Sequence, residues 1–218
     1  MARSIFCRLN GMIQLLVLAL SMSLSMAAVF DHPVNATSKQ ELSSVLLQMT
    51  RHDVVTGDFK QTKSIKKLNR DFVSTGTFRI SKTSGIVWKT QKPFPSELTV
   101  SDAGISERNV NGQVRVISSN DNPVFVQFSK TIQAVFSGNL SELETNFNIF
   151  CEKTSNGYTV GLVPREKAVQ KVIANIVMDV SENLEKVVIT DGEGSPVVYE
   201  FSNQKTSNEN SAEQPGAP

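Results

Sequence analysis

The sequence has few of the residues on which most enzyme and metal sites depend. Its 218 residues include two histidines, His32 and His52, and two cysteines. It contains no pair of histidines at metal-binding spacing, no glycine-rich phosphate loop and no G-x-S-x-G nucleophile motif. The closely spaced carboxylates Glu142 and Glu144 fall where a solvated face is expected. The sequence therefore predicts a protein that is not an enzyme and holds no metal or cofactor, with an enzyme site assembled from distant residues as an alternative.

The N-terminal segment has the pattern of an export signal. Two arginines precede an apolar run at residues 13–24, and small residues follow at Ser25 and Ala27. We expect residues 1–27 to be a secretory signal peptide, cut after Ala27 or Ala28. The alternative is an uncleaved membrane anchor, but the run is short against the ~20 residues that a spanning helix needs. No cysteine lies at the cleavage site for a lipid anchor, so we expect a soluble, monomeric periplasmic protein.

Charge and cysteine content argue against a nucleic-acid-binding protein and against a disulfide-bonded one. Without the two signal arginines, 20 basic residues face 21 acidic ones, a net charge of −1. This balance argues against a nucleic-acid-binding protein, which would normally be basic. Cys151 is then the only cysteine, so no intramolecular disulfide can form. Because it continues the apolar face of Phe147 and Ile149, we expect a buried, unreactive thiol.

Alternating apolar residues predict strands through most of the chain. Residues 57–118 form a meander in which Phe78 and Ile80 share one face, and strands resume from Phe147 to Phe201. Before the meander, Ser38 and Glu41 fit a capping box that opens a short amphipathic helix. The pattern predicts an α+β fold, one continuous antiparallel sheet covered by two or three helices.

The middle of the chain predicts an aromatic helix. Asn122-Pro123 resembles a helix start, and three phenylalanines follow at helical spacing up to Phe136. Its apolar face either fills the core or covers a lipid-sized cavity against the sheet. We expect residues 28–204 to form one domain and residues 205–218 to be a disordered polar tail.

A set of residues in order along residues 40–204 resembles the LolA family of periplasmic lipoprotein carriers. The set comprises Phe59, Gln61, Ser74, Gly76, Phe78, Trp88, Pro93, Asp179, Val187, Asp191, Tyr199 and Phe201. The resemblance implies a LolA/LolB-like fold, in which a curved antiparallel sheet, an incomplete β-barrel, is closed by helices over a hydrophobic cavity. It implies that acylated cargo passes from an inner-membrane exporter to an outer-membrane acceptor without covalent chemistry.

The chain departs from that family at the loop before the tryptophan. Where lipoprotein carriers place an arginine, usually followed by proline, this chain has Lys82-Thr83. Lysine cannot make the forked hydrogen bonds of arginine, so the family's lid contact would differ here. The run from Gly85 to Trp88 is more similar to a divergent subgroup associated with lipid-like or polyene products. The resemblance therefore implies a lipoprotein or another lipid, such as a glycolipid or polyene lipid, as the cargo.

We predict that the cavity is lined by apolar side chains of sheet and helix, with a lysine at its rim. The predicted ligand-binding residues are Phe59, Phe78, Ile80, Lys82, Trp88, Leu98, Val100, Phe125, Phe128, Ile132, Val135 and Phe136. The alternative function is a non-enzymatic envelope binding or scaffold module with a packed core and no cavity. A separate cluster of lysines at positions 60, 63, 66 and 67 is either a solvated hairpin or a contact for an acidic partner or lipid headgroups.

Overall fold

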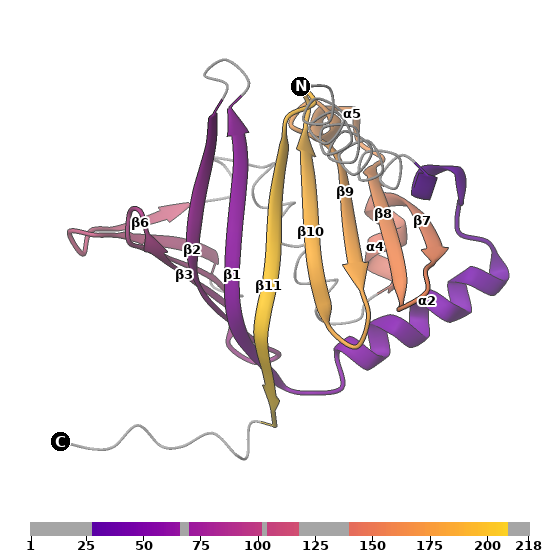
Figure 1. Ribbon diagram of the computed structural model, residues 1–218, viewed down its shortest axis with the longest axis horizontal. Coiled ribbons are helices and arrows are strands. Elements are labelled where there is room, and N and C mark those ends of the chain that lie inside the picture. The colour runs from indigo at the N-terminus through magenta and orange to yellow at the C-terminus, as the bar shows by residue number, and fades with distance from the viewer. Residues whose placement is uncertain (1–27, 66–69, 102–103, 118–139, 209–218) are drawn as a thin grey trace, which may run out of the picture.

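Eleven strands pair edge to edge in one antiparallel sheet within the residues that the computed structural model describes, namely 28–65, 70–101, 104–117 and 140–208. The order across the sheet is β6-β5-β4-β3-β2-β1-β11-β10-β9-β8-β7 (Figure 1). The strands are β1 Val54–Ile65, β2 Arg70–Ser81, β3 Gly85–Lys92, β4 Ser96–Ser101, β5 Gly104–Asn109, β6 Val114–Ile117, β7 Phe147–Lys153, β8 Tyr158–Pro164, β9 Ile173–Val180, β10 Leu184–Asp191 and β11 Pro196–Ser207.

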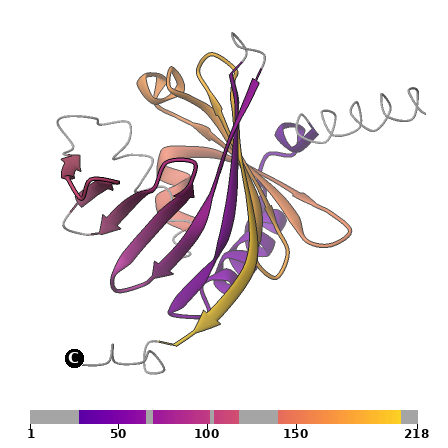
Figure 2. The ribbon, with the colours of Figure 1, turned by 60° about the vertical axis from the view of Figure 1, so that its left-hand side comes forward.

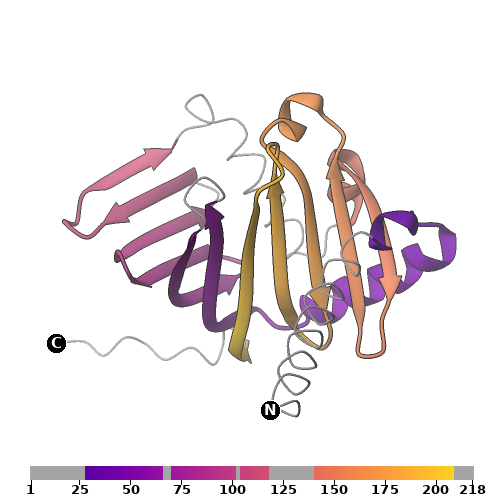
Figure 3. The same cartoon turned by 45° about the horizontal axis from the view of Figure 1, so that its top comes forward.

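β1 and β11, which come first and last along the sequence of these strands, are neighbours at the centre of the sheet. β1 pairs with β11 in antiparallel register, with Phe59 opposite Phe201. A register shift between Thr56 and Asp58 bends this seam, and another between Thr75 and Gly76 bends the pairing of β2 with β3. Strands β2–β6 consequently turn away from β7–β10, which gives the sheet two wings (Figures 2 and 3).

Helices lie on both faces of the β7–β10 wing. α2 (Ala36–Met49) and α4 (Leu140–Asn146) bury Leu42, Leu46 and Leu143 against the side chains of one face. On the other face, Val29 of the short helix η1 (Val29–Asp31) packs against Val177 and Val188. A further short helix, α5 (Lys167–Gln170), links β8 to β9 and was not predicted from the sequence.

The start of α2 differs from the predicted capping box. The Asn35 side chain, and not Ser38, caps the helix, because its Oδ1 accepts hydrogen bonds from the backbone N–H groups of Thr37 (2.9 Å) and Ser38 (3.0 Å). The Ser38 hydroxyl in turn accepts from the Asn35 N–H at 2.8 Å. The helix therefore begins at Ala36, three residues after Pro33.

The structure confirms the predicted fold class, an antiparallel sheet with few helices, and, in the described part of residues 57–118, the predicted meander of strands. The predicted polar tail from residue 205 needs correction, because β11 runs on to Ser207, where it pairs with Val54 of β1. The predicted helix at residues 123–136 lies outside the described residues.

Candidate functional site

The six sheet residues predicted to line the cavity come together in one apolar cluster. Phe59, Phe78, Ile80 and Val100 are buried in it, and Trp88 and Leu98 pack against it partly buried. The hairpin register explains the grouping, since Phe78 lies opposite Trp88 and Trp88 opposite Leu98 on adjacent strands. The members that the prediction omitted are Val55, Ile86, Ile105 and Phe201.

Aromatic rings form the centre of this cluster, which we call the aromatic wall: Phe59, Phe78, Trp88, Tyr199 and Phe201. The Trp88 ring centroid lies 4.2 Å from Phe59 and 5.9 Å from Phe78 in tilted and stacked geometry. It lies edge-on to Tyr199 at 5.6 Å and to Phe201 at 5.9 Å. Such pairs each contribute roughly 0.5–1.5 kcal/mol beyond the area they bury. The single tryptophan of the chain is therefore in contact with every other ring of the wall.

Two glycines make room for the rings of Phe59 and Phe78. In the pairing of β1 with β2, Gly57 lies opposite Phe78 and Phe59 lies opposite Gly76. A Cβ atom at Gly57 would come 2.8 Å from the Phe78 ring, and one at Gly76 would come 2.8 Å from the Phe59 ring. Each aromatic ring thus lies across the glycine of the neighbouring strand, which explains the two G-x-F triplets in this part of the sequence.

β11 supplies the two rings that the sequence-based lining missed. Tyr199 and Phe201 alternate on the last strand, and both also pack against the apolar cluster beneath α2. The alternation was visible in the sequence, but the pairing of β11 with β1 was not. Burial raises the pKa of the Tyr199 phenol above its usual value, so this side chain stays neutral at physiological pH.

Lys82 lies at the end of β2, outside the aromatic wall. Its Nζ atom is 3.2 Å from Oδ1 of Asp53, and its backbone N–H donates to the Asp53 carbonyl oxygen at 3.0 Å. Both side chains are about two-fifths exposed. Lys82 therefore links β2 to the connection between α2 and β1.

The helical half of the predicted lining cannot be placed beside this wall. Those residues, all of which lie outside the described part of the chain, are Phe125, Phe128, Ile132, Val135 and Phe136. The sheet half is thus the part of the candidate site that the structure places.

A hollow of about 600 Å³ is lined by residues of β1–β4 and β11, and Phe78 of the aromatic wall is among them. Polar and charged side chains line much of it, including Lys89, which pairs with Glu97 at 2.9 Å. Asn203 donates from Nδ2 to the Asp58 carboxylate at 2.6 Å. These interactions make one part of the lining polar, while Phe78 and Val87 make another part apolar.

Among the described residues, no group of three or more histidine, cysteine or acidic side chains is placed to hold a metal ion. Cys151 is buried on β7, and burial, with a smaller contribution from the charge of Glu41, raises its thiol pKa to about 11. The thiolate, which is the reactive form, is therefore scarce at neutral pH, as the sequence predicted. No helix in the described part of the chain is long and apolar enough to cross a membrane.

Comparison with known proteins places the chain in a family. The model of the family described as outer membrane lipoprotein carrier protein LolA matches residues 50–214. That match spans all five rings of the aromatic wall. No curated protein matches the sequence.

Several solved structures are similar at low sequence identity. A putative outer membrane lipoprotein-sorting protein domain from Vibrio parahaemolyticus is 10% identical, with 81% of this chain and 95% of that one covered and a TM-score of 0.42. A LolA superfamily protein from Nitrosomonas europaea is 8% identical, with 80% and 94% covered and a TM-score of 0.45. The MucA/MucB complex of Pseudomonas aeruginosa is 12% identical, with 78% and 57% covered and a TM-score of 0.47.

Proposed function

Because this chain belongs to the LolA family of outer membrane lipoprotein carriers, whose members are not enzymes, we propose that it is a periplasmic carrier of acylated cargo. The cargo, a lipoprotein or another lipid, would be received from an inner-membrane exporter and passed to an outer-membrane acceptor. The observation that supports this most is the aromatic wall itself. Five rings gather on one face of a curved sheet, and the central Trp88 is only partly buried.

The physical driving force is the removal of acyl chains from water. Each buried CH₂ group contributes roughly 0.8 kcal/mol, so a 16-carbon chain could gain about 12 kcal/mol before the costs of association. Aromatic and aliphatic side chains supply such an environment without any covalent step. A neutral Tyr199 phenol fits that environment, because an ionised group would be costly to bury beside the chain.

The N-terminal end of the described chain packs into the fold. Val29, which would be the second residue after a cut behind Ala27, is completely buried against β9 and β10. The second residue of the proposed mature chain is therefore part of the packed fold.

The test uses Trp88 as a probe, since it is the only tryptophan in the sequence. Fatty acids brominated along the acyl chain are titrated into the purified protein without membranes, and Trp88 emission is followed. We expect saturable quenching, because a bromine atom in the cavity would lie against the ring. Mass spectrometry of lipid that copurifies from the native envelope would then identify the cargo.

A pair of neighbouring variants separates the wall from the rest of the strand. Leu98 faces the wall and Thr99, the next residue of β4, faces the other side. Leu98→Asp places a carboxylate beside Trp88, and its desolvation costs several kcal/mol, so acyl affinity should fall by about 100-fold or more. Thr99→Asp should leave affinity nearly unchanged. If brominated chains do not quench Trp88, or both variants bind equally well, the carrier proposal fails and the scaffold module with a packed core is favoured.

A further inference from the structure

Two phenylalanine rings stack on each other in solvent at one end of the sheet. Phe72 of β2 is 39% exposed, and Phe94, in the turn between β3 and β4, is 70% exposed. Their centroids are 6.2 Å apart and their planes differ by 14°. Val73, the next residue of β2, is 44% exposed. Large apolar side chains that gather on the surface of a domain commonly mark a site of contact with another protein or a membrane.

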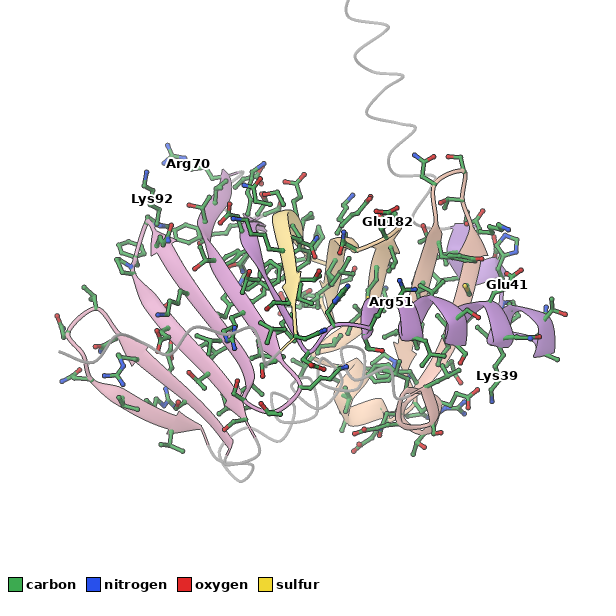
Figure 4. All side chains as sticks on the ribbon, turned by 90° about the horizontal axis from the view of Figure 1, so that it is seen from below. Lys39, Glu41, Arg51, Arg70, Lys92 and Glu182 are labelled. Atoms are coloured by element: carbon green, nitrogen blue, oxygen red, sulfur yellow. The ribbon has the colours of Figure 1, made fainter. Side chains whose placement is uncertain are left out.

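Three exposed cations lie at the same end of the sheet as the stacked rings. Lys63 of β1 lies directly opposite Phe72 in the strand register, and Arg70 lies two residues before Phe72 on the same face. Lys92 is the last residue of β3, two positions before Phe94. Arg70 and Lys92 project from the same end of the molecule (Figure 4). Among the described residues, none of the three has an acidic partner within ion-pair distance.

These three cations differ from Lys60, a nearby lysine of β1, because Lys60 has an acidic partner. Lys60, three residues before Lys63, is paired with Glu200 of β11 at 3.0 Å. The one acidic residue of this end of β2, Asp71, points to the other face and accepts a hydrogen bond from the Ser64 hydroxyl at 2.7 Å. The face of β1 and β2 that carries Phe72 is therefore apolar and, through Lys63 and Arg70, positively charged, and Lys92, opposite Thr75, lies at the same end of the sheet.

We propose that this end of the molecule docks on an anionic phospholipid surface, and we call it the docking tip: Lys63, Arg70, Phe72, Lys92 and Phe94. Aromatic rings flanked by lysine and arginine are the combination that partitions to the membrane interface, with the rings at headgroup depth and the cations against lipid phosphates. The tip lies at the end of a long hairpin and its two rings are exposed, so it suits a flat, yielding surface better than a peptide.

The position of the tip relates it to the candidate site. Phe72 and Phe78 lie on the same face of β2, with Ser74 and Gly76 between them. A docked tip would therefore turn one margin of the aromatic wall toward the lipid surface. The docking proposal goes beyond the proposed carrier function and does not depend on it.

The experiment is vesicle flotation with the whole mature chain. Vesicles of phosphatidylcholine alone are compared with vesicles that also contain phosphatidylglycerol. We expect binding to the anionic vesicles only, and loss of most of it at high salt because screening shortens the range of the attraction. Since each cation near an anionic surface contributes roughly fivefold in affinity, the triple variant K63Q/R70Q/K92Q should bind about 100-fold more weakly.

A single variant tests the contribution of the apolar rings of the docking tip, and two further variants serve as controls. Phe94→Ser should weaken binding by about 10-fold, because the ring no longer enters the interface. Val110→Ser removes an apolar side chain of similar exposure (69%) from the turn between β5 and β6 and should have no effect. The charge control K153Q/K167Q/K171Q removes three exposed lysines from the other wing.

The outcomes separate the two proposals. The docking proposal is overturned if the wild-type chain does not float with anionic vesicles, if neutral vesicles bind it as well, or if the control variants lose as much binding as the tip variants. Unchanged thermal unfolding of each variant excludes a folding defect. Quenching of Trp88 by brominated fatty acid, measured without vesicles, reports on the carrier function alone, so either proposal can fail while the other stands.

Discussion

Gly76→Ala is expected to destabilise the protein far more than an ordinary glycine substitution. A Cβ atom at this position would come 1.9 Å from the carbonyl oxygen of Lys89 and 2.8 Å from the Phe59 ring. Real Cβ atoms essentially never approach closer than 3.0 Å, so the β3 backbone must move by more than 1 Å. That shift disrupts the pairing of Gly76 with Thr90, at about 1 kcal/mol for each of about two hydrogen bonds.

Displacement of the Phe59 ring adds the cost of overpacking, about 1–3 kcal/mol. The free energy of unfolding should therefore fall by about 3–5 kcal/mol. For a domain of this size, about 2–4 °C of Tm is lost per kcal/mol, so a fall of roughly 10 °C is expected in scanning calorimetry. Because the displaced ring belongs to the aromatic wall, near-ultraviolet circular dichroism should change as well.

Gly194→Ala is the matched control for this substitution. Gly194 has a φ of +78°, but a Cβ atom there would meet nothing within 4 Å. Only the left-handed backbone conformation is penalised, at about 1–2 kcal/mol. If Gly76→Ala lowers Tm by no more than Gly194→Ala, the close contact between Gly76 and β3 is not a determinant of stability and the reasoning fails.

Three further predictions concern single side chains. Cys151, whose pKa burial raises from the usual 9.0 of a thiol to about 11, should stabilise the fold below pH 9 and lose that contribution, at most about 3 kcal/mol and less with solvent screening, as the pH rises to 11; Cys151→Ala should flatten the alkaline limb of the Tm–pH profile, and an equally steep limb would contradict this. Asn35→Ala should cost about 0.5–2 kcal/mol in urea unfolding because two backbone N–H groups of α2 lose their acceptor, and Ser38→Ala should cost less; the reverse order would restore the predicted capping box. Lys82→Ala should change the free energy of unfolding by less than about 1 kcal/mol, because its ion pair with Asp53 is exposed; a larger loss in calorimetry would show that this contact locks the domain.

Local patterns were sufficient to predict the sheet half of the candidate site. Phe78 and Trp88 alternate with polar residues on strands joined by a short turn, so both the shared face and the contact follow from the sequence. The same reasoning places Leu98 and Val100 on the next strand. These residues needed no information about distant parts of the chain.

The missing part of the wall depends on a contact between distant residues. Tyr199 and Phe201 join Phe59 only because β11 pairs with β1, about 140 residues away in the sequence. Strand alternation shows which residues share a face, but it does not show which strands are neighbours. The end of β11 was missed for a similar reason, since Ser207 is polar and is held in the strand by its pairing with Val54.

The choice of helix cap shows a limit of a different kind. Asn35 and Ser38 are both good capping residues three positions apart, and the sequence offers no way to rank them. The bridge between Pro33 and Phe150, with hydrogen bonds from Val34 to Ile149 and from Cys151 to His32, fixes the chain at the edge of β7 just before Asn35. This tertiary anchor sets the point at which α2 begins.

The seam between β1 and β11 also constrains when the protein can fold. β11, the last strand that the structure describes, joins the two wings, so neither the sheet nor the ring cluster around Trp88 can be completed before residues 196–207 are available. A chain leaves the ribosome or a translocation channel with its N-terminus first. Its sheet must therefore remain incomplete until the C-terminal strand has passed. For an exported carrier this order is advantageous, because the surface that would capture lipid is assembled only after the whole chain has crossed the membrane.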